Sequence, residues 1–198
     1  MTIKPFAESS EQNKDVILAV LELLFRECRN VLEIGSGTGQ HAVHFAAKLP
    51  HLVWHTSDMA ENHPGILLWL EEAGLLNTRP PLPLDVLRDP WPQMAVDAVY
   101  SANTAHIMGW QEVEAFFAGV GKLLPEGGLF ALYGPFNYGG QYTSASNARF
   151  DQWLKIRDPN SGIRDMDDLN RLAAAAGMVL LHDVEMPVNN RTLVWRKN

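Results

Sequence analysis

The stretch Glu33-Ile34-Gly35-Ser36-Gly37-Thr38-Gly39 decides the fold of this chain. It begins at the end of the apolar run 31–34, which predicts a strand, and it precedes a predicted helix over residues 39–48. Glycine adopts positive φ angles and lets a ligand approach the backbone, and a helix N-terminus offers N–H groups without helical partners. The sequence therefore predicts a strand–loop–helix unit that binds a ligand at its loop, with a tight turn that binds nothing as the alternative.

The spacing of the glycines restricts the kind of ligand. The dinucleotide fingerprint is G-x-G-x-x-G, whereas here the glycines follow the pattern G-x-G-x-G and Gln40 comes next. Glu33 stands two residues before the first glycine, where a carboxylate repels a pyrophosphate and suits an ammonium or sulfonium group. A P-loop is excluded because no Gly-Lys-Ser/Thr follows. The loop favours a cationic ligand over a nicotinamide dinucleotide.

Helix and strand patterns alternate along the rest of the chain, which predicts a parallel α/β sheet. Ser9-x-x-Gln12 matches a capping box at the start of the first helix, and the prolines at 81 and 83 place a weak strand at a sheet edge. Only residues 185–191 separate the last two strands, so these must pair antiparallel. The other helices are expected over 10–26, 64–73, 110–124 and 165–176, and the other strands over 52–58, 82–84, 96–101, 129–133, 178–184 and 192–195.

Composition bounds the domain and its partners. The 198 residues are expected to form one domain, with an N-terminal helix within 1–29 and a polar excursion over 134–163 on the substrate side. The net charge of −7 disfavours nucleic acid as a partner. The single Cys28 fits a reducing compartment, and no apolar run has the length of a membrane helix. We therefore expect a cytoplasmic protein without a membrane partner.

Residues 31–39 resemble the first motif of the class I S-adenosylmethionine-dependent methyltransferases. The weak strand at 82–84 is similar to the third, edge strand of that family, and the terminal hairpin is similar to its antiparallel seventh strand. The resemblance implies a Rossmann-like α/β fold with helices on both faces of a mostly parallel, seven-stranded sheet in the order 3-2-1-4-5-7-6. It also implies S-adenosylmethionine as the cofactor.

Further stretches resemble one group within this superfamily, the methyltransferase-like proteins of similar length to which no substrate is assigned. These stretches cover most of the chain in the right order: 7–14, 133–136, 146–151, 158–164 and 186–190. This closer resemblance names a fold and a cofactor without naming a reaction.

The resemblance implies a cofactor site made from several segments. Asp58, at the end of the second strand, would hold the ribose hydroxyls, and Asp85 with Val86 would meet the adenine. A surface-loop aspartate is the alternative for Asp58, a helix cap is the alternative for Asp85, and a helix-surface amide is the alternative for Asn13. The remaining residues expected at the cofactor are Asn13, Glu33, Gly35, Ser36, Gly37, Gly39, Gln40, His41, Met59 and Asn103.

Methyl transfer requires a nucleophile held about 3 Å from the methyl carbon, in line and shielded from water. His106 follows the predicted strand 96–101, at the edge where open α/β sheets bind ligands, and is the expected general base. A histidine that packs on the cofactor or caps a helix is the alternative. The residues expected to contact the substrate, with ordinary loop or surface roles as the alternative, are Tyr133, Asn137, Tyr142 and Arg164.

No metal site is expected. His41 and His44 lie three apart on a predicted helix, but no third ligand has a fitting spacing. The sequence after strand 96–101, Asn103-Thr104-Ala105-His106, lacks the Asp/Asn-Pro-Pro-Tyr/Phe motif of methyltransferases that act on nucleic-acid amino groups. The leading hypothesis is a methyltransferase for a small molecule. A non-catalytic binding module and an NAD(P)-dependent oxidoreductase are the alternatives, and a homodimer stays open.

Overall fold

The computed structural model describes residues 4–198, which fall into two compact units, one up to Ser101 and one from Ala102 onward. Hydrogen bonds join the main strands in the order β3-β2-β1-β4-β5-β9-β8, while β6 and β7 form a small sheet of their own. Numbered along the main sheet alone, this is the expected order 3-2-1-4-5-7-6. The α/β fold class of the class I methyltransferases is confirmed.

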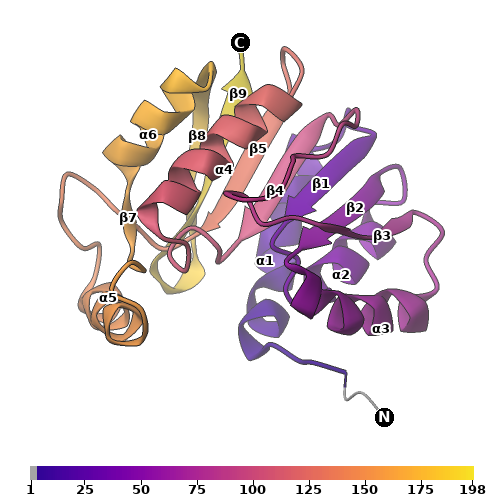
Figure 1. The fold of residues 1–198 in the computed structure, drawn as a ribbon, viewed down its shortest axis with the longest axis horizontal. Helices are drawn as coiled ribbons and strands as arrows, with labels where there is room; N and C mark the ends of the chain where they lie inside the picture. Colours follow the sequence, from indigo (N-terminus) through magenta and orange to yellow (C-terminus); the bar gives the residue numbers. More distant parts are fainter. Residues whose placement is uncertain (1–3) are drawn as a thin grey trace. The chain divides into compact units, whose positions relative to one another are not determined.

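The first unit contains three helices and a run of parallel strands (Figure 1). β1 pairs in parallel with β2 and β4, and β2 pairs in parallel with β3. The prolines of β3 lie at the edge of the sheet, where a missing N–H costs no ladder bond. The elements are α1 (Glu8–Leu24), β1 (Asn30–Ile34), α2 (Gln40–Lys48), β2 (Val53–Asp58), the 3-10 turn η1 (Ala60–Asn62), α3 (His63–Ala73), β3 (Thr78–Pro83) and β4 (Ala98–Ala102).

The expected capping box at the start of α1 is wrong. The N-cap is Ala7, whose carbonyl accepts the N–H groups of Ser10 and Glu11, and no side chain caps the helix. Ser9 lies inside the helix, and the Gln12 amide instead donates to the Glu8 carboxylate at 3.0 Å. Acidic residues in the first turn favour the positive end of the helix dipole, so α1 starts two residues earlier than the motif predicted.

The second unit holds the end of the chain as an antiparallel hairpin. β9 pairs antiparallel with β8, because the 3-10 turn η2 between them leaves no room for a crossover, and it also pairs antiparallel with β5. The polar excursion 134–163 contains a helix, α5. The elements are α4 (Trp110–Leu123), β5 (Leu129–Gly134), β6 (Phe136–Asn137), α5 (Ala145–Arg157), β7 (Arg164–Asp165), α6 (Met166–Ala175), β8 (Met178–Met186), η2 (Pro187–Asn189) and β9 (Asn190–Lys197).

Buried aromatic side chains fill the core of each unit. In the first unit the ring of Phe45 on α2 contacts those of Trp54 and Tyr100, at centroid distances of 5.4 and 5.5 Å. In the second unit Phe117 on α4 and Trp195 on β9 both pack on the Phe130 ring, at 5.3 and 5.4 Å. Rings of this size dominate core stability. Within residues 4–198, no helix has the length and apolar character needed to cross a membrane.

Candidate functional site

The glycine loop between β1 and α2 passes through the left-handed backbone region at each of its glycines. Gly35, Gly37 and Gly39 have φ angles of 73°, 58° and 93°. The N–H groups of Gly35 and Ser36 both donate to the carbonyl of Ser57 at 3.0 Å, which fixes the loop against the end of β2. The loop conformation therefore requires glycine, as its sequence predicted.

Gly37 and Gly39 serve different purposes in this loop. A Cβ on Gly39 would lie 3.2 Å from the Ile66 Cα and 3.3 Å from the Trp69 Cβ, so α3 packs directly on this glycine. A Cβ on Gly37 would meet no heavy atom of the described chain within 4 Å. Gly39 is needed for packing within the fold, whereas Gly37 presents bare backbone to open space, where a ligand can approach it.

The Asp58 carboxylate lies at the same loop. Its Oδ2 accepts the Gly37 N–H at 2.6 Å, and its Oδ1 accepts the Met59 N–H at 2.7 Å and the Asn62 amide at 2.8 Å. A carboxylate has about four acceptor positions, so a ligand hydroxyl has a place beside these three donors. The structure thus joins the second-strand aspartate to the second glycine, two residues that the sequence placed 21 positions apart.

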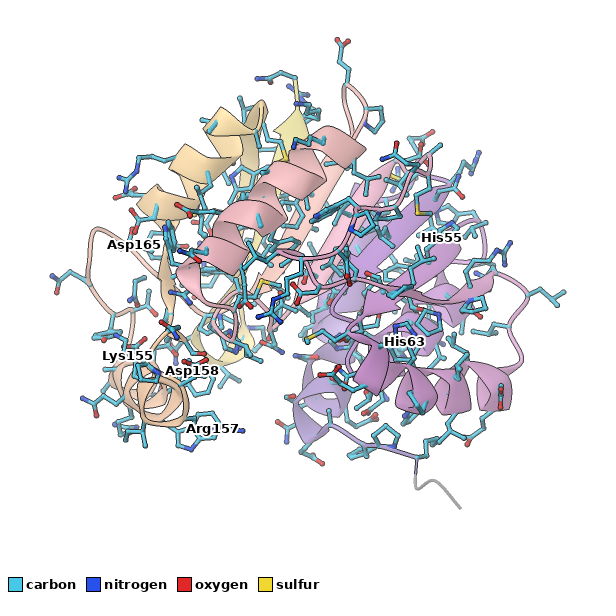
Figure 2. The ribbon with its side chains drawn as sticks, in the orientation of Figure 1. His55, His63, Lys155, Arg157, Asp158 and Asp165 are labelled. Atoms are coloured by element: carbon cyan, nitrogen blue, oxygen red, sulfur yellow. The ribbon has the colours of Figure 1, made fainter. Side chains whose placement is uncertain are left out.

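The end of β2 is held in place by α3. The ring Nε2 of His63, at the start of α3 in Figure 2, donates to the main-chain carbonyl of Asp58 at 3.0 Å. The Leu84 N–H donates to the same carbonyl at 3.0 Å and so places the segment after β3 next to it. Met59, the residue after Asp58, is 44% exposed. His63 is a supporting residue that the sequence analysis missed, because only the tertiary fold brings α3 to this strand end.

The first turn of α2 connects the glycine loop to α1. Buried His41 donates from Nε2 to the Asn13 Oδ1 at 2.7 Å, and burial lowers the pKa of His41 to about 4, so the ring is neutral. Gln40 accepts the N–H of Ala7 on its Oε1 at 2.6 Å. The Gln40 Nε2 atom is buried and has no hydrogen-bond partner among residues 4–198. A buried amide without an acceptor costs about 1–3 kcal/mol, so it favours a ligand that supplies one.

Glu33 lies beneath the loop as a buried strand residue. Its carboxylate is 2% exposed and accepts the Trp54 indole N–H at 3.0 Å. Burial raises the pKa of Glu33 to about 7, and the nearby Asp58 charge acts in the same direction, while the hydrogen bonds from Trp54 and Ser36 oppose it. A carboxyl group with a raised pKa gains most from a positive charge nearby, which agrees with the cationic ligand that the loop spacing favours.

Asp85 and Val86 follow β3, but the Asp85 side chain is used locally. Its Oδ1 accepts the N–H groups of Leu87 and Arg88 at 3.0 and 3.1 Å. Asp85 thus stabilises a turn over residues 86–88, and the helix cap that was the alternative for Asp85 is wrong because no helix begins there. Asn103 belongs to the second unit, has a φ of 58° and donates its N–H to the Tyr133 carbonyl at 2.9 Å.

His106 is buried in the second unit. Its ring packs edge-on against Phe150 of α5 at a centroid distance of 5.2 Å, and its Nδ1 lies 3.7 Å from where a Gly134 Cβ would be. Burial, with a smaller effect of the Arg164 charge, lowers the pKa of His106 to about 4. The imidazole is therefore neutral at pH 7 and has a lone pair for a proton.

The four expected substrate residues all lie in the second unit. Tyr133 is buried in β5, and Asn137 lies in β6, which pairs with β7. Tyr142 is 43% exposed and donates its hydroxyl to the Asp151 carboxylate at 2.7 Å. Arg164 donates its guanidinium N–H groups to main-chain carbonyls of the loop that contains His106. Asp151 lies in the stretch 146–151, to which the sequence assigns no site role.

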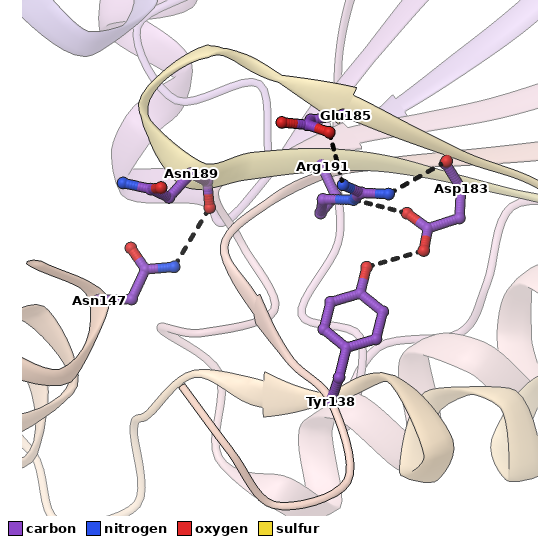
Figure 3. A network of polar contacts seen from close by, with 6 residues as sticks. All are labelled: Tyr138, Asn147, Asp183, Glu185, Asn189 and Arg191. Carbon is purple, nitrogen blue, oxygen red and sulfur yellow. Dashed lines mark hydrogen bonds and ion pairs between the residues drawn. The ribbon is translucent and has the colours of Figure 1, made fainter. Parts of the chain in front are cut away.

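A second polar network joins the excursion to the terminal hairpin (Figure 3). The Tyr138 hydroxyl donates to Asp183 Oδ2 at 2.8 Å, and Arg191 Nε donates to Asp183 Oδ1 at 2.8 Å. Burial and the Asp183 carboxylate raise the pKa of Tyr138, so the hydroxyl keeps its proton. Asn147 of α5 donates to the Asn189 carbonyl at 3.2 Å. These contacts hold the excursion on the hairpin, and no local pattern in the sequence identifies them.

The residues around the glycine loop fit an S-adenosyl ligand. The open side of Gly37 and the acceptor capacity of Asp58 suit a ribose, and the buried amide of Gln40 suits a carboxylate. Among residues 4–198, the structure holds no cluster of three His, Cys, Asp or Glu side chains with metal-ligand geometry.

Solved structures share this fold at low sequence identity. One is an O-methyltransferase family protein from Burkholderia thailandensis, with a TM-score of 0.84 at 15% identity over 96% of this chain and 56% of that chain. Another is the mitomycin 7-O-methyltransferase MmcR, with a TM-score of 0.84 at 14% identity over 96% and 54%. A third is human N-acetylserotonin methyltransferase in complex with SAM, with a TM-score of 0.79 at 15% identity over 96% and 53%. The chain spans about half the length of these methyltransferases.

A family model matches the chain almost from end to end. The match runs over residues 4–197, and the model's description is "Protein of unknown function (DUF938)". The expected resemblance to methyltransferase-like proteins is confirmed at the level of the fold. The chain belongs to the DUF938 family and has the fold of the S-adenosylmethionine-dependent methyltransferases.

Proposed function

We propose that this protein is an S-adenosylmethionine-dependent methyltransferase that acts on a small molecule. The observation that carries the proposal is the pair formed by Gly37 and Asp58: bare backbone facing open space, bonded to a carboxylate at the end of β2. The fold shared with methyltransferases, one of them described in complex with SAM, supports the same reading.

The chain's own residues have defined parts in this proposal. Asp58 would accept hydrogen bonds from the ribose, Gln40 would donate to the ligand's carboxylate, and Glu33 beneath the loop would compensate positive charge. Asn13 would act through His41, which it orients. When bound, the cofactor supplies an activated methyl group. The neutral imidazole of His106 would take the proton of the acceptor.

A small acceptor fits the available observations better than a nucleic acid. The net charge is −7, so the chain as a whole repels a polyanion. Two structural neighbours are named as methyltransferases of mitomycin and N-acetylserotonin, both small molecules. The single cysteine supports the cytoplasm as the place of action.

Calorimetric titration with S-adenosylmethionine and S-adenosylhomocysteine tests the proposal, with NAD and NADP as comparison ligands. We expect both S-adenosyl compounds to bind and neither dinucleotide to do so. Binding of NAD(P) alone would establish the oxidoreductase alternative. No S-adenosyl binding at millimolar ligand would refute the methyltransferase.

Gly37→Ala provides the sharper test, because the fold offers a matched control. Gly74, at the end of α3, has a φ of 60° and also has open space at its Cβ position. Alanine at either site costs about 1 kcal/mol of backbone strain. We expect Gly37→Ala to weaken S-adenosylhomocysteine binding at least tenfold and Gly74→Ala to leave it unchanged. Equal affinities in the two variants would place the ligand elsewhere.

A further inference from the structure

Segment 160–164 donates hydrogen bonds to the loop 105–108, which contains His106. Four consecutive carbonyls of that loop accept hydrogen bonds from the segment, so the main chain on both sides of His106 is fixed. Arg164 supplies two of these bonds, and Nη2 of its guanidinium also donates to the Asn160 carbonyl at 2.9 Å. The four bonds are Arg164 Nε to Ala105 O at 3.0 Å, Gly162 N to His106 O at 2.9 Å, Ser161 Oγ to Ile107 O at 2.7 Å, and Arg164 Nη2 to Met108 O.

Segment 160–164 is itself bonded to α5 through a buried carboxylate. Asp151, which is 1% exposed, accepts the N–H of Ile163 on its Oδ1 at 2.7 Å. A Cβ on Gly162 would lie 2.9 Å from the same oxygen, so only glycine allows this approach. Lys155, which is labelled on α5 in Figure 2, pairs with the other oxygen of Asp151 at 2.6 Å. The segment therefore has a fixed support within the second unit.

The ring of His106 packs against Phe150 in the direction across the loop. Phe150, which contacts the ring, lies next to Asp151 on α5. One helix therefore supports both the His106 ring and segment 160–164, which is bonded to the main chain at His106. A lysine in place of Arg164 keeps the charge but cannot reach several carbonyls at once, because the planar fork of donors is lost.

We propose that Arg164, which the sequence analysis expected to contact the substrate, is a positioning residue: its guanidinium fixes the loop 105–108 and thereby the orientation of His106. This inference rests on the proposed role of His106 as the base. Arg164 is thus assigned a contact to the chain itself rather than to the methyl acceptor, because its N–H groups donate to main-chain carbonyls.

The test is the titration of His106 in protein labelled with ¹³C-histidine, its signal assigned with His106→Gln. In Arg164→Lys we expect the pKa of His106 to rise by at least one unit toward 6.5, because a loosened loop hydrates the ring while the nearby charge is kept. The Gly162 amide, which bonds His106 O, should exchange its hydrogen at least tenfold faster. Arg171→Lys, at an exposed arginine of α6 paired with Asp168, is the control and should change neither quantity.

Ser161→Ala removes only the donor to Ile107 O and keeps the inference testable if Arg164→Lys does not fold. It should shift the His106 titration in the same direction by a smaller amount. An unchanged titration and unchanged Gly162 exchange in a folded variant would overturn the inference. Titration of wild type with S-adenosylhomocysteine separates the two levels: absent binding refutes the proposed function, whereas binding with an unresponsive His106 refutes only the positioning role.

Discussion

Glu33 in the first unit and Asp151 in the second are both buried carboxylates, and their pKa values move in opposite directions. Burial is the largest single influence on each group and by itself acts to raise the pKa of both, so the opposite net shifts come from their other partners. Glu33 has the indole N–H of Trp54 and a hydrogen bond from Ser36, and its pKa rises to about 7. Asp151 has the Lys155 ammonium, the Tyr142 hydroxyl and the Ile163 N–H, and together these lower its pKa below its ordinary value.

The two groups differ in the charge of their partners: Asp151 is paired with the Lys155 ammonium, whereas Glu33 accepts from the neutral Trp54 indole. Asp151 accepts hydrogen bonds from an ammonium group, a hydroxyl and a main-chain N–H of its own chain, and therefore serves as a structural anchor. The hydrogen bonds to Glu33 come from the neutral side chains of Trp54 and Ser36, so its ionised form gains further stability when a positive group arrives. This difference distinguishes a carboxylate that completes the fold from one that awaits a ligand.

The largest expected effect comes from removing the anchoring carboxylate of Asp151. Asp151→Ala leaves the Ile163 N–H without its acceptor and should reduce the free energy of unfolding at pH 7 by about 3 kcal/mol. Because the folded-state pKa of Asp151 is lowered, its contribution is present above pH 3.8 and is lost as the pH falls below that value. Urea unfolding at pH 7 and pH 3 measures both effects.

Asp168→Ala is the matched control for that variant. Asp168 forms an i,i+3 pair with Arg171 on the exposed side of α6, where ion pairs contribute less than about 1 kcal/mol. A loss at Asp151 no larger than the loss at Asp168 would show that the carboxylate anchors nothing.

Glu33→Gln should act in the opposite direction. Since the folded-state pKa of Glu33 is raised from 4.5 to about 7, its favourable contribution is complete below pH 4.5 and is lost as the pH rises through 7. Glutamine keeps an acceptor for Trp54 without the charge, so the variant should be more stable than wild type at pH 7 by about 2 kcal/mol.

Unfolding curves between pH 4.5 and pH 8 measure this difference, with Glu71→Gln on the exposed part of α3 as the control. The same variant should bind S-adenosylmethionine more weakly if Glu33 compensates its charge. A stability difference that does not change with pH would mean that Glu33 is ionised throughout, and the comparison with Asp151 would fail.

Tyr142→Phe should have the smallest effect, because it removes one donor from Asp151 and leaves the others. The Asp151 pKa should rise toward its ordinary value, which makes this carboxylate slightly more like Glu33. Tyr142 is 43% exposed, so the stability loss should stay below about 1 kcal/mol. A carboxyl ¹³C titration of Asp151 measures the change, and a pKa that does not move would show that Lys155 and Ile163 alone set it.

Much of the fold could be predicted because local patterns specify it. The glycine loop, the edge strand with its prolines and the antiparallel hairpin each depend on a few neighbouring residues. The start of α1 was predicted wrongly, since the polar residues at 9 and 12 satisfied a local rule that the backbone at Ala7 overrode. Strand limits at β3 and β4 also differ by several residues, because pairing with the neighbouring strand determines where a strand begins.

The candidate site was predictable only in part. Gly37 and Asp58 were expected at one ligand, and the structure joins them directly. The His63 contact to β2, the bond between Asn13 and His41 and the anchor at Asp151 were not foreseen, because each joins residues from different elements.

The sequence by itself determined the class of fold and the ligand loop, because positive φ angles select glycine and helix and strand periodicities select their elements. Only the tertiary structure decided what each polar side chain does. A carboxylate or a guanidinium has no fixed role until its neighbours set its charge and its partners. The place of Glu33 before the glycines already favoured a positive ligand group, whereas the roles of Asp151 as an anchor and of Arg164 as a positioning residue came from the donors and acceptors around them in the fold.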